Sequence, residues 1–474
     1  MAGSPEDSAL NHPTGLHPTT QSPRRGDPGL RRALGKWDLT AIGVNQVIGS
    51  AIFLLPSDVA KEIGPWGPLA FMAIGLLSLS IALCFAEAGS RFETTGGPYL
   101  PARAAFGRFV GFETGWMMWF ARVASHASVV NGLTLALAFY WPSLNEGIPR
   151  AATIISLTTF LTWINVRGIK QSSWFVNALT IGKLLPLAIF IIGGIWFVDP
   201  SHFSNMPDVG RIQIQQAAIL LIFAYGGYEV TGVLAGEASN PRKDVPFAFV
   251  ACLIIVSVVM SLTSLVATGL LPDVGATRTP LADGAVLFLG AAGAAMIAIG
   301  SVVSMTGNNM GQLLNGSRTI FALAENGDLP RWFGKVHPTY RTPANAILFG
   351  AVVALILALS GTFAALATVS AIARLVMYLA VCLSVLVLRK RDREIAAQVG
   401  AHLPAHRSLG EGGDDPLQVV KPPTFTVPLG PVIPVLASVV ALGILAGASR
   451  AQLISGAAAL LGGAVLFFLA RRRR

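Results

Sequence analysis

The chain has 474 residues, of which 53% are hydrophobic and 12% are charged. Soluble globular domains carry about 25% charged residues, so this composition excludes a protein built mainly of soluble domains. The formal net charge of +10 would suit nucleic-acid binding by its size, but the positions of the basic residues give it another explanation.

Apolar runs of about 20 residues, the length that crosses a bilayer, recur along most of the chain. We predict twelve membrane spans, at about 38–60, 67–90, 112–140, 151–166, 173–198, 214–236, 246–271, 284–322, 343–360, 363–388, 428–448 and 451–470. Residues 1–36 are rich in Pro, Ser, Thr and Arg without the apolar core of a signal peptide, so we expect a disordered cytoplasmic tail. Residues 37–388 would form the core of the protein, 389–427 a polar cytoplasmic loop, and 428–474 two accessory spans with a basic C-terminus.

The basic residues predict the orientation of these spans. With the N-terminus inside, most of the 34 Lys and Arg residues fall on the N-terminal tail, the inner loops and the basic C-terminus. The outer loops carry Lys61, Arg150, Arg211, Arg278 and Arg450, and the spans carry Arg122, Lys183 and Arg374. This bias predicts a multi-pass protein of the cell membrane with both termini cytoplasmic, which explains the net charge without nucleic acid.

Two spans are interrupted by small residues where a membrane helix should be continuous. The first interruption is GVNQVIGSAIF at Gly43–Phe53 and the second is FAYGGYE at Phe223–Glu229. Unwound backbone inside a bilayer persists only where it lines a cavity or is buried in protein. Broken spans at corresponding places in two halves of a chain point to a transporter's substrate site. The alternative is that the glycines only let helices pack closely.

The breaks predict a site for a zwitterion. The half-helix after a break offers free N–H groups, and the half-helix before it offers free carbonyls, so together they can hold an anion and a cation. An α-amino acid carries both charges. Its carboxylate would lie at the amides near Ser50 and Ala51, and Gly49 at the first break would be part of the same site. Its ammonium would lie at the carbonyls near Val47, Ile48, Phe223 and Ala224, with Gly226 opening the second break. Tyr225 and Asn308 are predicted to add specificity.

Several motifs, in order along the chain, carry a resemblance to a known family. They are IGSAIF at Ile48–Phe53, FAEAGSRF at Phe85–Phe92, TGGPY at Thr95–Tyr99, FAYGGYE at Phe223–Glu229, GEASNPRKDVP at Gly236–Pro246 and SRTIFALAENGDLPRW at Ser317–Trp332. Together they resemble amino acid permeases of the amino acid–polyamine–organocation superfamily.

The resemblance implies an all-α polytopic membrane protein with a LeuT-type fold. Two inverted repeats of five helices, about 38–198 and 214–388, would each open with a broken span, so that helices 1 and 6 are discontinuous, and two C-terminal helices would follow. The family usually has glycine where this chain has Ala51. The added methyl group narrows the space above the break and favours a smaller or differently placed ligand.

Ionisable residues within the spans are expensive and usually functional. Lys183 lies where related permeases carry a lysine and sodium-coupled relatives of the fold bind an ion, so it would act in proton coupling or as a static positive charge. Arg374 would contact an acidic substrate group or pair with Glu229, and Glu229 would contact the substrate ammonium or a neighbouring helix. Glu237, before Asn240, is interpreted as a gate or a helix-end anchor. Arg122 and His126 share a helix face and could line the pathway or only pack.

No nucleotide-binding or hydrolase motif occurs, and the three cysteines have no metal-ligand spacing. We therefore expect neither an enzyme nor a cofactor or metal site. The predicted function is secondary active transport of an amino acid or small amine by alternating access, as a sodium-independent proton symporter. Alternatives are an exchanger and a sensor that binds an amino acid without moving it. Expected partners are the substrate, protons and membrane lipids, and the substrate's identity stays open.

Overall fold

The computed structural model describes residues 34–92, 96–168, 173–204, 206–399 and 420–472. The N-terminal tail predicted for 1–36 lies almost wholly outside them, as does the middle of the loop predicted for 389–427. Within the described residues the secondary structure is helical apart from one isolated bridge between Leu34 and Ala238. Residues Arg32–Arg474 form one compact unit.

The first half of the chain contains two short helices in place of the first predicted span. The helices are α1 (Lys36–Val47), α2 (Ala51–Ile63), α3 (Gly67–Gly89), α4 (Tyr99–Phe106), α5 (Arg108–Ala138), α6 (Gly147–Arg167) and α7 (Ser173–Gly194). The helix α4 was not among the predicted spans. It is short and precedes α5 directly.

The second half likewise begins with an interrupted helix. It contains α8 (Arg211–Tyr225), α9 (Val230–Val233), α10 (Pro241–Leu270), α11 (Pro280–Glu325), α12 (Ala344–Ser360), α13 (Phe363–Val399), α14 (Val432–Ala446) and α15 (Arg450–Arg472). Gly290, with φ of 62°, kinks the long helix α11 near its start. Helix α13 continues to Val399, so the loop predicted to begin at 389 begins later.

Seven of the described helical segments are long and apolar enough to cross a membrane. They are Ala51–Gly89, Thr180–Phe197, Arg211–Val233, Pro241–Leu270, Pro280–Glu325, Phe363–Ala397 and Arg450–Ala470. Helices α12 and α14 are apolar but shorter. This pattern fits a polytopic membrane protein, while the count of twelve spans stays a prediction.

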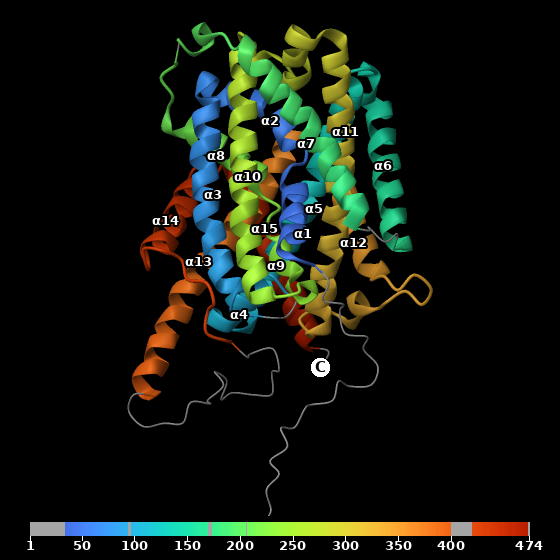
Figure 1. Ribbon diagram of the computed structural model, residues 1–474. Helices are drawn as coiled ribbons and strands as arrows, with labels where there is room; N and C mark the ends of the chain where they lie inside the picture. The colour runs from blue at the N-terminus through green and yellow to red at the C-terminus, as the bar shows by residue number, and fades with distance from the viewer. Residues whose placement is uncertain (1–33, 93–95, 169–172, 205, 400–419, 473–474) are drawn as a thin grey trace, which may run out of the picture. The chain divides into compact units, whose positions relative to one another are not determined.

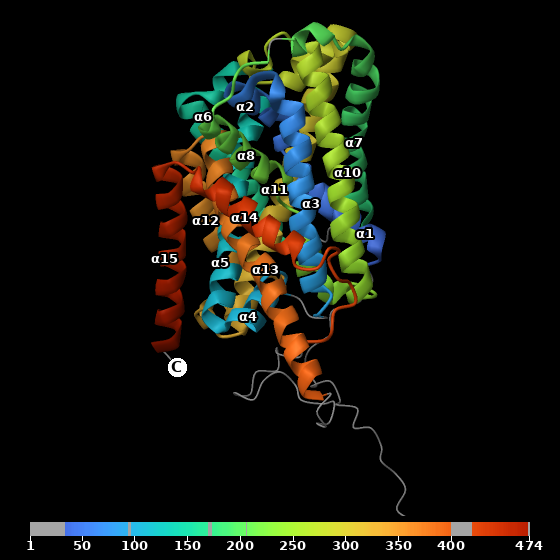
Figure 2. The ribbon, with the colours of Figure 1, turned by 90° about the vertical axis from the view of Figure 1, so that its left-hand side faces the viewer.

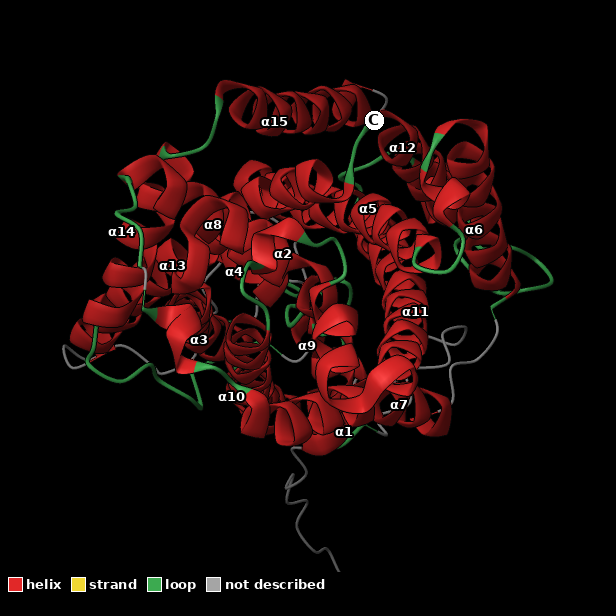
Figure 3. Cartoon of the chain, turned by 90° about the horizontal axis from the view of Figure 1, so that it is seen from above, coloured by secondary structure: helices red, strands yellow, loops and turns green. Residues whose placement is uncertain are grey.

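The interrupted helices occupy the interior of the helix bundle. In the apolar stretch of Arg211–Val233, 94% of the residues are buried, against 28% for Arg450–Ala470. Seen from above, α2 and α9 lie near the middle of the bundle, and α6, α14 and α15 lie at its rim (Figure 3). Exposed apolar side chains such as Phe160 on α6 and Leu461 on α15 mark surfaces suited to lipid.

Helices from distant parts of the sequence pack side by side. Helix α3 lies along α10, and α5 lies between α11 and α13 (Figures 1 and 2). The start of α1 and the end of α15 lie at the same end of the bundle (Figure 1). The two helix breaks are therefore enclosed by α3, α5, α10, α11 and α13.

Candidate functional site

The two helix breaks contact each other through their backbones. Helix α1 ends at Val47 and α2 begins at Ala51, whereas α8 ends at Tyr225 and α9 begins at Val230. Gly227 has φ of 130°, and a Cβ placed there would lie 2.6 Å from the Gln46 carbonyl oxygen. Only glycine satisfies both the backbone conformation and this close approach. The breaks predicted from the two glycine clusters thus form one site.

A narrow cavity lies at the point where the breaks meet. It contains about 210 Å³ of space between atoms. Its lining comes from both breaks, from α5 and from α11, and consists of Gln46, Val47, Gly49, Ser50, Ala51, Ser125, Val129, Phe223, Gly226, Asn308 and Gln312. Most of the substrate-site residues predicted from the sequence line this cavity.

Three of the predicted residues lie outside its lining, and four lining residues were not predicted. Ile48, Ala224 and Tyr225 do not line it, and the Tyr225 hydroxyl donates instead to the Phe71 carbonyl at 2.8 Å. The residues missed are Gln46, Ser125, Val129 and Gln312. Gln312 lies one helical turn from Asn308, so the spacing of polar residues in that span was a signal for it.

Hydrogen-bond donors without partners lie at the start of α2. Among the described residues, the backbone N–H groups of Gly49, Ser50 and Ala51 have no backbone acceptor. The Ser50 hydroxyl also has no partner, although Ser50 is 1% exposed. These donors coincide with the positive end of the α2 dipole. This side of the cavity is therefore suited to a carboxylate.

Lys183 occupies the carbonyl end of α1. Its ammonium Nζ donates to the carbonyl oxygens of Asn45 at 2.9 Å and Ile48 at 2.7 Å. The Ser304 hydroxyl lies 3.1 Å from both the Ile48 and the Gly49 carbonyl oxygens and can donate to either. On this side of the cavity, a ligand ammonium could reach the Val47 carbonyl and the second lone pair of the Phe223 carbonyl, which already accepts from the Gly226 N–H at 3.1 Å.

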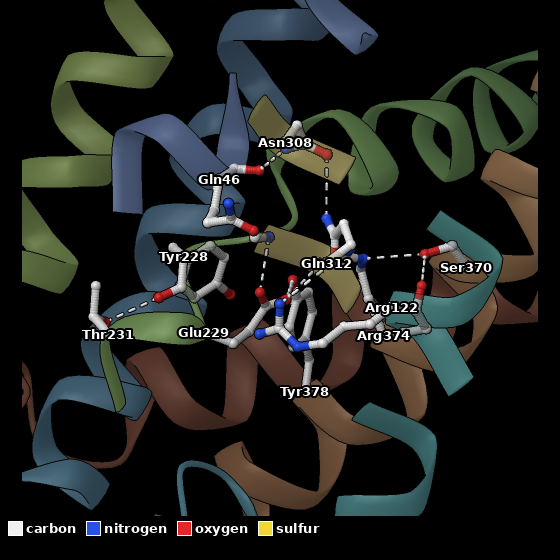
Figure 4. Close-up of polar contacts among 12 residues, drawn as sticks. Gln46, Arg122, Tyr228, Glu229, Thr231, Asn308, Gln312, Ser370, Arg374 and Tyr378 are labelled. Atoms are coloured by element: carbon white, nitrogen blue, oxygen red, sulfur yellow. Dashed lines mark hydrogen bonds and ion pairs between the residues drawn. The ribbon is translucent and has the colours of Figure 1, made fainter. Parts of the chain in front are cut away.

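Glu229 and Arg374 form a buried ion pair beneath the second break. Arg374 Nη1 lies 2.8 Å from Glu229 Oε1, and the side chains are 2% and 1% exposed. The Tyr378 hydroxyl donates to the same oxygen at 2.5 Å, and the Gly227 N–H donates to Oε2 at 2.7 Å (Figure 4). Of the alternatives that the sequence left open for these two residues, the structure contains the pair. It ties the start of α9 to α13.

Two further ion-pair clusters join elements at the end of the bundle where α1 begins. Glu237 pairs with Arg318 of α11 at 3.1 Å, and both are partly exposed. Asp328, fully buried, accepts from Tyr99 at 3.0 Å and pairs with Arg108 at 2.5 Å. Burial and the Asp328 carboxylate raise the pKa of Tyr99, so its phenol stays protonated at neutral pH. Glu237 therefore links the segment after α9 to α11, and its role as a gate or as a helix-end anchor stays a prediction.

The described residues contain no group of three or more His, Cys, Asp or Glu side chains placed to hold a metal ion. The polar atoms at the cavity are instead those of backbone, amides and hydroxyls. Such groups can form hydrogen bonds with the amino group and the carboxyl group of one ligand.

A comparison with known protein families identifies this arrangement. The amino acid permease family model matches residues 34–463. The chain belongs to the amino acid permease family. The family is one of membrane transport proteins, so this permease is a multi-pass membrane protein and not an enzyme.

Individual relatives of the permease come from Bacillus subtilis (strain 168). A methylthioribose transporter is 28% identical over 96% of each chain. The serine/threonine exchanger SteT is 30% identical over 77% of this chain and 85% of its own. The branched-chain amino acid permease BcaP is 27% identical over 94% of this chain and 95% of its own. These relatives support amino acid transport as the permease's general function.

Proposed function

We propose that the protein is a secondary active transporter of a small α-amino acid, working by alternating access as a sodium-independent proton symporter. The observation that carries the proposal is the cavity between the two helix breaks, lined on one side by N–H groups without a backbone acceptor among the described residues and on the other by the carbonyl ends of α1 and α8. A zwitterion is the ligand that such a pair of helix ends holds through the backbone alone.

In the proposed complex the substrate carboxylate accepts from the N–H groups of Gly49, Ser50 and Ala51. The ammonium donates to the carbonyls of Val47 and Phe223. The Ala51 methyl group narrows the space above the first break, which favours a substrate with a small side chain.

The Lys183 ammonium is proposed to replace a coupling sodium ion. It places a positive charge on the carbonyls of Asn45 and Ile48, at the negative end of the α1 dipole. A lysine can release and regain a proton, which a bound sodium ion cannot. Because a neutral amine still donates, proton release there would weaken both hydrogen bonds and remove the positive charge from the Asn45 and Ile48 carbonyls. This links the proton to the conformation of the first break.

The proposed topology follows the family fold. Two inverted repeats, about 38–198 and 214–388, would open with α1–α2 and α8–α9, and α14 and α15 would be accessory. Both termini would lie in the cytoplasm of a cell-membrane protein. In alternating access, the bundle carrying the broken helices would move against α5 and α11 around the cavity.

Uptake into proteoliposomes tests the proposed function. The relatives' names set the panel: serine, threonine, branched-chain amino acids and methylthioribose. We expect accumulation of a small amino acid driven by an inward proton gradient, unchanged when potassium replaces sodium. Uptake that requires internal substrate and ignores the proton gradient would instead indicate an exchanger, as SteT is named. Saturable binding without uptake or exchange would refute transport and favour a sensor.

A further inference from the structure

A second buried cavity adjoins the substrate cavity, between α5, α11 and α12. It contains about 220 Å³ of space between atoms. Its lining includes Trp119, Arg122 and His126 of α5, Gln312 and Gly316 of α11, and Gly350 of α12. Gln312 lines both cavities, so its side chain forms the wall between them.

The polar atoms of this second cavity are mostly donors that lack acceptors. Arg122 Nε and Nη2 and Trp119 Nε1 have no hydrogen-bond partner among the described residues. Neither ring nitrogen of His126 forms a hydrogen bond of good geometry within them, and the nearest polar group that acts on this ring is the Asn309 backbone. The three side chains are at most 2% exposed. Guanidinium and indole groups can only donate. A buried donor without an acceptor is costly, so the cavity is built for a ligand that accepts.

The charges around the cavity are also unbalanced. Arg374 is neutralised by Glu229, and the Lys183 ammonium is held by two carbonyls. No carboxylate of the described residues forms an ion pair with Arg122, and Glu229, which is already paired with Arg374, attracts it only from a longer distance. Among the described residues, the one hydrogen bond of Arg122 is a long one of 3.5 Å from Nη1 to Gln312 Oε1. A buried guanidinium needs a counter-charge.

We propose that this second cavity is a binding site for a small anion, held by Arg122, Trp119 and His126. The anion is either a free ion such as chloride or the side-chain carboxylate of a bound amino acid that reaches past Gln312. Only the second source rests on the transport function proposed above. The same donors would bind either anion, so the experiment tests chloride and the substrate carboxylate separately.

A chain of hydrogen bonds connects the anion site to the first helix break. Gln312 Nε2 donates to Asn308 Oδ1 at 3.4 Å, and Asn308 Nδ2 donates to the Gln46 carbonyl at 2.6 Å (Figure 4). An anion that draws Arg122 away from Gln312 would free the Gln312 amide to reorient. Occupancy of the anion site therefore changes the polar wall of the substrate cavity.

The test measures thermal unfolding and ligand binding on the purified full-length chain. Unfolding midpoints are compared in sodium chloride and in sodium gluconate of equal concentration, since gluconate is too large for the cavity. Binding of L-glutamate is compared with that of its neutral isostere L-glutamine, and L-serine reports on the substrate cavity alone. The same measurements are made on Arg122→Gln, Arg122→Lys and Trp119→Phe.

A free-ion site predicts a higher midpoint of the wild type in chloride. A substrate-carboxylate site predicts that L-glutamate binds about tenfold or more tightly than L-glutamine. The difference in midpoint or in affinity should vanish in Arg122→Gln and persist in part in Arg122→Lys, which keeps the charge. Trp119→Phe should make the same difference smaller, because it removes the indole donor while an aromatic ring stays stacked on Phe349, 5.2 Å away. If Arg122→Gln does not fold, the Trp119→Phe result tests the anion site in its place.

Equal midpoints in both salts, with equal binding of L-glutamate and L-glutamine, would overturn the anion site. If L-serine still binds in that case, the proposed transport function stands. A chloride effect that depends on Arg122, in a protein that binds no amino acid, would support the anion site and count against amino acid transport.

Discussion

At the scale of single residues, the structure shows how a few glycines and one lysine shape the site. Gly227 lets the two breaks touch, and Lys183 neutralises the carbonyl end of α1. Removal of the ammonium would take one donor from each of the Asn45 and Ile48 carbonyls at the negative end of a helix dipole, and the Ile48 carbonyl would keep only the Ser304 hydroxyl within reach. The residue thus contributes to both the geometry and the charge of the first break.

We predict that Lys183→Ala abolishes the dependence of uptake on the proton gradient and lowers uptake by about tenfold or more. The reason is that the variant keeps the cavity lining but loses the one ammonium that the described part of the chain places at the break. The matched control is Lys61→Ala, since the Lys61 side chain is 51% exposed. Proton-driven uptake of normal pH dependence by a folded Lys183→Ala protein would rule out the coupling role.

The Glu229–Arg374 pair gives a prediction about stability. Glu229→Gln leaves the Arg374 guanidinium buried without its counter-charge, which costs about 3–5 kcal/mol. The thermal midpoint of Glu229→Gln should therefore fall sharply, as should that of Arg374→Gln. The double variant should recover part of the loss, because neither charge then remains unpaired. Additive losses in this double-mutant cycle would show that the two side chains are not coupled.

At the scale of elements, a partly exposed ion pair, Glu237–Arg318, at 3.1 Å joins α11 to the 3-10 helix Ala235–Glu237 that follows α9. Such a pair contributes about 0–1 kcal/mol, so it can break during a transport cycle without threatening the fold. It lies at the end of the bundle where α1 begins, next to the Leu34–Glu237 backbone hydrogen bond of 3.1 Å. This contact is a candidate for a gate that opens and closes.

We predict that locking this contact stops transport but not folding. In Glu237→Cys/Arg318→Cys, a short cleavable dithiol-reactive cross-linker should abolish uptake, and dithiothreitol should restore it. The native cysteines Cys84, Cys252 and Cys382 are buried, and each single-cysteine variant serves as a control. Full uptake by completely cross-linked protein would exclude motion between these elements.

The sequence predicted both helix breaks to within a few residues, because glycine clusters and their flanking apolar runs are local signals. It did not predict that α13 continues to Val399. That extension depends on tertiary contacts: Arg389 donates to the buried Glu87 at 2.7 Å, and Asp392 pairs with Arg91 at 2.8 Å. Arg389 and Asp392, which were predicted to lie in a loop, are held in a helix by partners about 300 positions earlier in the chain.

At the scale of the whole molecule, the family and the membrane class could be inferred from motifs and composition, but the full cavity lining could not. Gln46 and Gln312 line the cavity because of how α1 and α11 are rotated against their neighbours, and helix rotation follows from packing. The same packing places the Ile48 carbonyl, which was predicted to bind the substrate ammonium, against the Lys183 ammonium. Contacts of this kind follow from the tertiary structure and could not be predicted from the sequence.

The central claim is that the two helix breaks together form the substrate site. A Cβ at Gly49 would lie 2.8 Å from the Asn308 amide, across the cavity lining. A Cβ at Gly443 in α14 would meet no atom within 4 Å, which makes Gly443→Ala the matched control. Gly49→Ala adds one methyl group at the first helix break, and Gly443→Ala adds one methyl group to α14.

The most direct measurement is equilibrium binding of the transported amino acid to purified wild type, Gly49→Ala and Gly443→Ala. We predict that the Kd of Gly443→Ala equals that of the wild type and that the Kd of Gly49→Ala rises by about tenfold or more, equivalent to about 1.4 kcal/mol. Wild-type affinity in a folded Gly49→Ala protein would contradict the claim.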